Sequence, residues 1–428
     1  MELRITIPGR LTVNEIIRKL GRALMFVYIL LTFISRSDYL PANSVSLALY
    51  GFILLGCANF VVNAKGRIVN THMLWYLVFI AMSLFWVLIL WQNWPDAEWL
   101  GTVYQMVVVL ALSLSLSQFV ESRKDIRMVS YAYTLGAVLL MLFLAMAGRL
   151  HEDERLGETI MGNANIFADF YMTAAIMALW MAVNGRNVWE RLLFWTGIIV
   201  IFYGLLLSGG RKFILIPFIV LYIMLLMRKD KQGRNHIILY SVMVAALFGG
   251  VIWVMMSNET LYQSVGYRME YLFNMISGEG NIGSSNETRK QMRMLALSEG
   301  FESPLWGHGF DAFKNLGLRR LGYYAYSHNN WTEMWYNYGL IGFVVYYWFY
   351  GKQVLSLWKY RKMTQDLAAF GIAIIISLFI YEYGAVSYFE TQNQTLLCLV
   401  AIMYGICQKG DGKKSGKDKN VSSPSVEG

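Results

Sequence analysis

The polar segment from Asn286 to Gly342 carries the side chains best suited to chemistry in this chain. It is the longest stretch too polar to lie in lipid, and it contains Ser327-His328-Asn329. Ser327 is a favourable N-cap residue, which predicts a helix beginning at His328. A helix N-terminus disfavours the imidazolium ion, so we expect a neutral imidazole that accepts a proton or donates a hydrogen bond to an anion. A histidine that only caps the helix is the alternative.

Arg211 is a second candidate, in the run Ser208-Gly209-Gly210-Arg211-Lys212 between two apolar stretches. Two glycines let the backbone turn sharply, so this run predicts a tight hairpin between two helices. Arg211 would begin the second helix, where the positive end of the helix dipole favours a phosphate. An arginine that reaches toward lipid head groups is the alternative.

Two further arginines belong to helices that we expect inside the polar region itself. Residues 262–276 have apolar side chains at helical spacing, and the glycine- and serine-rich run 277–285 interrupts them. A second helix is expected from about Asn286. It places Arg289 and Arg293 one turn apart on the same face.

The elements that must position these residues are membrane helices. Of the 428 residues, 56% are hydrophobic and only 15% are charged, which is typical of polytopic membrane proteins. Apolar runs long enough to cross a bilayer recur along the chain. The expected fold is all-α, with about 12 transmembrane helices over 20–34, 43–62, 72–91, 100–120, 128–147, 165–183, 192–207, 213–227, 237–256, 338–357, 368–385 and 391–407.

The basic residues predict the orientation, because lysine and arginine concentrate in cytoplasmic loops. With both termini cytoplasmic, 25 of the 37 Lys and Arg residues fall on the inner side and only five in the short outer loops. The remaining seven lie in the loop 257–337, which becomes extracytoplasmic. Fusing the helices around Ser208 would place the basic cluster from Arg228 to Arg234 outside, so the bias also supports two helices there.

The expected organisation has five parts. An amphipathic N-terminal segment, 1–19, lies on the cytoplasmic face, and its Thr12-Val13-Asn14-Glu15 matches a capping box. Membrane helices one to nine occupy 20–256, and the large helical loop between the ninth and tenth helices, 257–337, carries the candidate site. Membrane helices ten to twelve occupy 338–407. The tail, 408–428, is predicted to be disordered and cytoplasmic.

Asp169 is a carboxylate inside an expected span, one turn after Asn165. Such a group is costly in lipid, so it should face the bundle interior. Binding a substrate and pairing with a buried arginine are equally open.

Other functions receive little support from the sequence. The net charge of +9 follows from the loop bias, so nucleic-acid binding is not predicted. Cys57, Cys398 and Cys407 lie in or beside spans and lack the spacing of a disulfide framework or a zinc site.

Several motifs in this order resemble the O-antigen ligase and polymerase superfamily of bacterial envelope glycosyltransferases. These are the hairpin Ser208-Gly209-Gly210-Arg211, Arg289 followed by Pro304-Leu305-Trp306-Gly307-His308-Gly309-Phe310, and Ser327-His328-Asn329 leading into Tyr338-Gly339-Leu340-Ile341-Gly342. The resemblance is strongest over 192–349. Asn337 departs from it, since the family often has an acidic residue there, and Arg293 stands where tryptophan is common.

The resemblance implies transfer of a glycan from an undecaprenyl-diphosphate carrier to an acceptor hydroxyl, at the outer face of the bacterial cytoplasmic membrane. His328, Arg211 and Arg289 would be catalytic: the arginines stabilise charge that develops on the diphosphate, and His328 takes the acceptor proton or hydrogen-bonds the diphosphate. No metal or cofactor is implied. The partners would be the lipid-linked donor, a glycan or lipid acceptor, and membrane lipids. The expected substrate-binding residues are Arg293, Lys212, Asn329, Asp169, Tyr326 and Trp331.

Two ambiguities stay open at this point. A ligase would pass a finished glycan to a lipid or another acceptor, whereas a polymerase would pass it to another lipid-linked unit, in the synthesis of O-antigen, capsule or exopolysaccharide. The alternative from another class is a twelve-helix transporter or flippase of a lipid-linked glycan. Against it, no repeat relates the two halves, and the polar residues gather in one outer loop.

Overall fold

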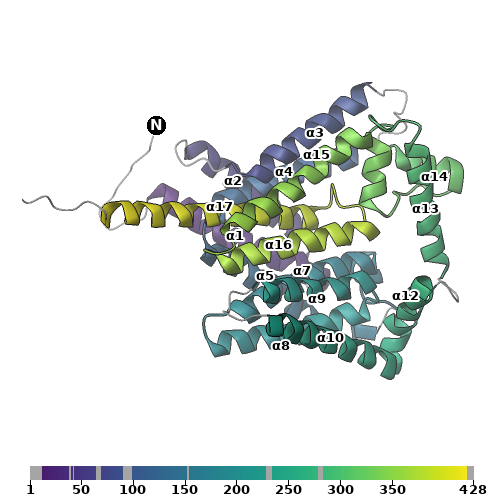
Figure 1. The fold of residues 1–428 in the computed structure, drawn as a ribbon, viewed down its shortest axis with the longest axis horizontal. Helices are drawn as coiled ribbons and strands as arrows, with labels where there is room; N and C mark the ends of the chain where they lie inside the picture. Colours follow the sequence, from purple (N-terminus) through teal and green to yellow (C-terminus); the bar gives the residue numbers. More distant parts are fainter. Residues whose placement is uncertain are drawn as a thin grey trace, which may run out of the picture.

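The described part of the protein is a helical bundle without strands, which confirms the all-α prediction. The computed structural model describes residues 12–37, 40–41, 43–63, 69–89, 99–151, 154–227, 234–277 and 283–421. In Figure 1, helices α12 (Tyr267–Ser277), α13 (Ser284–Gly300) and α14 (Phe313–Leu321) lie together at one end of the bundle. The end of α17 (Thr391–Val421) projects from the opposite end.

Each of the twelve expected spans overlaps one long helix. Of the helices in the described part of the chain, eight are long and apolar enough to cross a membrane, which indicates a multi-pass membrane protein, and the count of twelve stays a prediction. These eight are α2 (Ser44–Val62), α3 (Thr71–Ile89), α4 (Trp99–Phe119), α5 (Arg123–Met146), α7 (Ala164–Asn184), α8 (Val188–Leu207), α10 (Arg234–Ser257) and α16 (Gln365–Tyr381). The other four are α1 (Val13–Ile34), α9 (Arg211–Leu226), α15 (Asn330–Tyr360) and α17.

Helix α7 is the central element of the bundle. It packs against α5, α8, α9 and α16, and nearly all of its side chains are buried. Alanines along it, among them Ala168, Ala175 and Ala182, let neighbouring backbones approach closely. This packing places Asp169 inside the bundle, as its cost in lipid requires.

The two ends of the chain differ from the prediction. Thr12 forms the expected capping box, but α1 then runs unbroken to Ile34 instead of forming a separate surface helix. Arg22 contacts Asp125 at 3.0 Å and Gly21 packs against Phe119, so these turns join the bundle. At the other end α17 continues to Val421, because extending an existing helix needs no new nucleus. Residues 1–11 and 422–428 lie outside the described residues.

The hairpin between α8 and α9 forms as predicted. Helix α8 ends at Leu207, Ser208 is its C-cap, and α9 begins at Arg211. Gly209 has a φ of +67°, and an added Cβ would lie 2.5 Å from the Ser264 carbonyl oxygen. The hairpin therefore touches the π-helical turn Tyr262–Gly266 of the loop, which only glycine permits at this position.

A kink in α15 joins the segment 257–337 to the bundle. Gly339 has φ 62° and ψ −162°, a conformation that interrupts the helix and is almost confined to glycine. The turn from Pro304 to Gly309 fills the gap in the hydrogen-bond ladder. The Leu340 N–H donates to the Pro304 carbonyl at 2.8 Å, and the His308 and Gly309 N–H groups donate to the Tyr336 and Asn337 carbonyls at 2.9 Å.

We expect Gly339→Ala to destabilise the protein by about 2 kcal/mol or more, because alanine strains this backbone and its Cβ would lie 2.5 Å from the Leu305 carbonyl carbon. The measurement is the thermal unfolding midpoint in detergent. The control is Gly351→Ala on the same helix, where an added Cβ meets nothing within 4 Å. Equal midpoints for the two variants would contradict the structural role of the kink.

Candidate functional site

His328 lies just before α15 and not at its first position. The N-cap residue is Asn329, whose side chain accepts a hydrogen bond from the Thr332 N–H, so the prediction of Ser327 as N-cap is wrong. His328 itself has a φ of +57°, in the left-handed region. For a residue with a Cβ this conformation costs on the order of 1 kcal/mol, and it persists only where the surroundings fix it.

The imidazole of His328 is half-buried beside three cationic groups. Burial, followed in order of importance by the charges of Arg289, Lys212 and Arg293, lowers its pKa to about 4. Its ring meets Tyr326 edge to face at 4.8 Å, and among the described residues it has no hydrogen-bond partner. The expected neutral imidazole is thus favoured, but by burial and neighbouring positive charge and not by a helix N-terminus.

Arg211 connects the hairpin to two helices of the loop. One terminal nitrogen donates to the Arg268 carbonyl at 2.7 Å, and the other donates to Asn286 Oδ1 at 2.9 Å. A guanidinium has five N–H donors, so three remain for another ligand. Arg211 therefore holds α12 and α13 over the hairpin while keeping part of its binding capacity.

Arg289 on α13 lies within electrostatic range of both Arg211 and His328. Its guanidinium makes no hydrogen bond or ion pair with any described residue, which leaves all five donors available. Burial lowers its pKa, with Arg293 and Arg268 acting in the same direction and Tyr326 opposing them. Arg293, one turn later, lies over the Tyr383 ring at 5.3 Å.

Two arginines that were not singled out from the sequence complete the cluster. Arg155 donates to the Ser208 carbonyl at 3.0 Å and to Asn165 Oδ1 at 3.1 Å. Arg268 has a buried Nε without a hydrogen-bond partner among the described residues. Arg155 had a signal in the sequence, since few arginines occur in the short outer loops. Arg268 had none, because only the packing of α12 brings it to the hairpin.

We call Arg155, Arg211, Arg268 and Arg289 the arginine cluster. Burial lowers the pKa of Arg211, and the positive charges of the other three act in the same direction, which places all three within electrostatic range of Arg211. Within the described part of the chain only Arg155 has an ion-pair partner, Glu158 at 3.6 Å. A site with this excess of positive charge and free guanidinium donors is suited to bind a multiply charged anion, such as a phosphate or diphosphate.

Asp169 and Lys212 form a second group of charged side chains, and Arg289 of the arginine cluster acts on Lys212 electrostatically. Lys212 Nζ donates to the Gly384 carbonyl at 2.8 Å, lies 4.0 Å from the Tyr381 ring centre, and interacts electrostatically with Glu390 and Asp169. Among the described residues Asp169 forms no ion pair with an arginine and its Oδ1 has no hydrogen-bond partner, and Lys212 is the cation that acts on it electrostatically. Lys212 in turn contributes to the positive potential at His328.

The remaining predicted residues are engaged with the protein. The Asn329 amide caps α15 and also donates to the Tyr383 carbonyl at 2.9 Å, which gives it a structural role. Trp331 packs against Phe379 and Tyr383, with ring centres 4.6 and 5.8 Å away. Of the three aromatic and amide candidates beside His328, Tyr326 is the one that contacts its imidazole.

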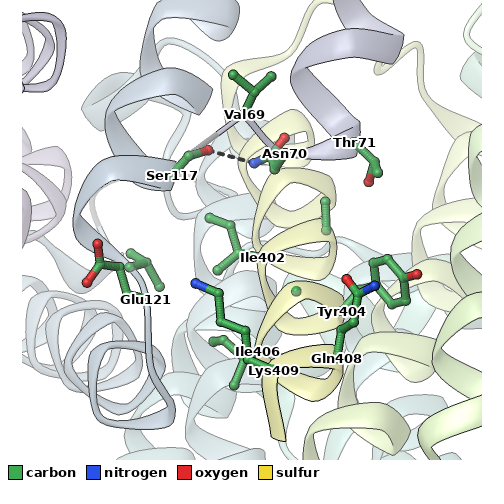
Figure 2. Close-up of a pocket in the computed structure, with 13 residues that line it drawn as sticks. Val69, Asn70, Thr71, Ser117, Glu121, Ile402, Tyr404, Ile406, Gln408 and Lys409 are labelled. Atoms are coloured by element: carbon green, nitrogen blue, oxygen red, sulfur yellow. Dashed lines mark hydrogen bonds between the residues drawn. The ribbon is translucent and has the colours of Figure 1, made fainter. Parts of the chain in front are cut away.

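A pocket between α3, α4 and α17 lies apart from this site. Asn70, Ser117, Glu121 and Lys409 are among the side chains that line it (Figure 2). Lys409 is 18 residues along α17 from Thr391, or about 27 Å of helix. None of the candidate site residues contributes to this pocket.

The fold and the site together define a multi-pass helical membrane protein with a cationic site at one end of its bundle. Residues 196–347 match the family model described as O-antigen ligase. The matched region coincides with the part of the chain, 192–349, whose motifs resemble the O-antigen ligase and polymerase superfamily. The match contains Arg211, Arg268, Arg289 and His328. The comparison with curated proteins finds none that matches the chain.

The pKa of His328 predicts the acid limb of the pH profile. The imidazole accepts a proton only when neutral, so kcat/KM, which reports groups of the free enzyme, should stay level down to about pH 5 and fall near its pKa of about 4. An ordinary histidine would give a fall near about 6.5. The measurement is glycan transfer by detergent-solubilised protein, with folding checked at each pH.

Arg293→Gln supplies the control for this profile. Removing one cation should raise the pKa of His328 and move the acid limb to higher pH. An acid limb near pH 6.5 in the unsubstituted protein, or no movement in the variant, would contradict the electrostatic account.

Proposed function

We propose that this protein transfers a glycan from an undecaprenyl-diphosphate carrier to an acceptor hydroxyl. The reaction takes place at the outer face of the bacterial cytoplasmic membrane, with both termini in the cytoplasm and residues 257–337 outside. The observation that supports it most is the arginine cluster beside a neutral imidazole, within the part of the chain that matches the family.

The arginine cluster binds the diphosphate of the donor. When the bond between the anomeric carbon and the phosphate oxygen breaks, its electrons remain on that oxygen, and negative charge develops on the leaving carrier diphosphate. Among the described residues Arg289 uses none of its five donors and Arg211 uses two, so the others can hold this charge in a partly buried site. Because the guanidinium groups are fixed before the reaction, they need little rearrangement as the charge forms.

His328 acts as the general base. The acceptor oxygen forms a new bond to the anomeric carbon, and its proton passes to the neutral imidazole as that bond forms. The low pKa of His328 describes the protein without its donor. Bound diphosphate would raise that pKa through its negative charge, which makes the imidazole a better proton acceptor once the donor is in place.

Substitution of the two central residues tests this function. His328→Ala should lower turnover by roughly 10² to 10⁴. Arg211→Lys should also abolish measurable transfer, because lysine lacks the planar fork that serves Arg268, Asn286 and the diphosphate together. The measurement is glycan transfer at matched protein levels, with Arg361→Lys as the control. Arg361 donates to the Trp358 carbonyl of its own helix, at the end of α15 far from His328. Full activity in either site variant would remove the assignment.

The products that accumulate in a strain without the protein distinguish a polymerase from a ligase. In a deletion strain, single repeat units on the carrier would identify a polymerase. Long chains that stay on the carrier and reach no final acceptor would identify a ligase. Both outcomes use the same donor site.

A further inference from the structure

The turn that contains His328 is held by the residues on either side of it. Ser327 and Asn329 are buried, whereas the His328 side chain is half-buried and faces the cationic groups. Asn329 is fixed by the Tyr383 carbonyl and the Thr332 N–H. On the other side, the Ser327 N–H donates to Glu333 Oε2 at 2.7 Å. Hydrogen bonds of the preceding residue and of the following residue therefore fix the backbone position of His328.

Glu333 is a fully buried carboxylate on the first turn of α15. Within the described residues it has no cationic partner, so it does not serve an ion pair. Its second oxygen accepts a hydrogen bond from Asn337 Nδ2 at 3.2 Å. Asn337 is fully buried too, and its Oδ1 accepts from the Phe313 N–H at 3.0 Å, where α14 begins.

These contacts form a series of hydrogen bonds that links Ser327, Glu333, Asn337 and Phe313, and the Glu333 carboxylate accepts two of them. Two N–H groups donate to Glu333, one from Ser327 and one from Asn337, so the ionised form is the one that accepts both bonds. Burial opposes ionisation and raises the pKa of Glu333 to about 7. A buried carboxylate is retained at such a cost when its hydrogen bonds do something that an apolar side chain could not.

We propose that Glu333 is a positioning residue for glycan transfer: through Ser327 it sets the strained backbone of His328, and through Asn337 it ties that turn to α14. The inference rests on the proposed role of His328. It also gives a defined role to Asn337, where the family often has an acidic residue, because this amide supplies the donor that the Glu333 carboxylate requires.

Each hydrogen bond in the series from Ser327 to Phe313 has a fixed donor and acceptor. The positioning role can therefore be tested by exchanging the carboxylate and the amide between positions 333 and 337. In Glu333→Gln, the new amide oxygen can still accept from Ser327, but its NH2 faces the Asn337 NH2. Flipping Asn337 would turn its NH2 toward the Phe313 N–H, so one mismatch always remains. Asn337→Asp alone sets two carboxyl groups side by side. They can share one proton, so this variant is assayed at a pH high enough to ionise both, where they repel each other.

The double variant, Glu333→Gln with Asn337→Asp, restores the complementarity. The introduced glutamine accepts from the Ser327 N–H and donates to the introduced aspartate. The other oxygen of that aspartate accepts from the Phe313 N–H. Every hydrogen bond of the series therefore returns, with the direction of the central one reversed.

We expect Glu333→Gln to lower kcat by about 100-fold through displacement of the base, while the KM for the donor stays within about twofold. Asn337→Asp should lower kcat by at least about tenfold, from the same displacement. The variant with both changes should recover most of the lost turnover. All proteins are assayed at matched folded amounts, judged by size exclusion and thermal unfolding in detergent.

A second readout does not depend on activity. Hydrogen–deuterium exchange of the peptide spanning Ser327 should be faster in each single variant and return to the original rate in the double variant. If Glu333→Gln leaves kcat and exchange unchanged, or the double variant stays inactive although its exchange is restored, the positioning role is wrong. If a loss of activity disappears once folded amounts are matched, Glu333 serves stability alone and the proposal also fails.

Failure of the proposed function gives a different pattern. An active His328→Ala variant would remove the general base whatever the Glu333 variants do. The exchange rates would still show whether Glu333 holds the turn.

Discussion

The repulsion among half-buried guanidinium groups is the constraint on which the end of the bundle that carries α12 and α13 depends. Arg155, Arg211, Arg268 and Arg289 lie close enough to affect one another, and only Arg155 has an acidic partner in the described part of the chain. Without an anion, this arrangement is held together by hydrogen bonds and packing, among them the bonds from Arg211 to Arg268 and Asn286. Diphosphate would supply the missing negative charge, so binding and stability of the loop are coupled.

The same positive charge also determines the state of the histidine. Burial and the neighbouring cations keep His328 neutral well below physiological pH, so the groups that would bind the leaving diphosphate also prepare the base. In the proposed reaction, the same positive charges would bind the diphosphate of the donor and keep the base for the acceptor hydroxyl neutral. A bound diphosphate would in turn raise the pKa of the imidazole, so donor binding would strengthen the base.

Two close backbone contacts connect the helical bundle to the segment that carries the candidate site. Glycine at position 209 allows the hairpin to touch the loop, and glycine at 339 opens α15 so that the turn from Pro304 to Gly309 can dock. Both contacts involve backbone atoms, which cannot move aside as a flexible side chain would. The positions of Arg211 and His328 are therefore fixed by close backbone approaches at the two ends of the loop.

The sequence by itself determined the all-α fold, the break between α8 and α9 and the resemblance to the O-antigen ligases. Hydrophobic runs, paired glycines and motif order are local signals, and they need no knowledge of distant contacts. Only the tertiary structure decided that Asn329 caps α15, that Lys212 is the cation acting on Asp169, that Arg155 and Arg268 lie near Arg211, and that Glu333 bonds to Ser327. The physical reason is that these roles depend on which helices pack together, and the residues concerned are separated by up to 178 positions, from Arg155 to Glu333.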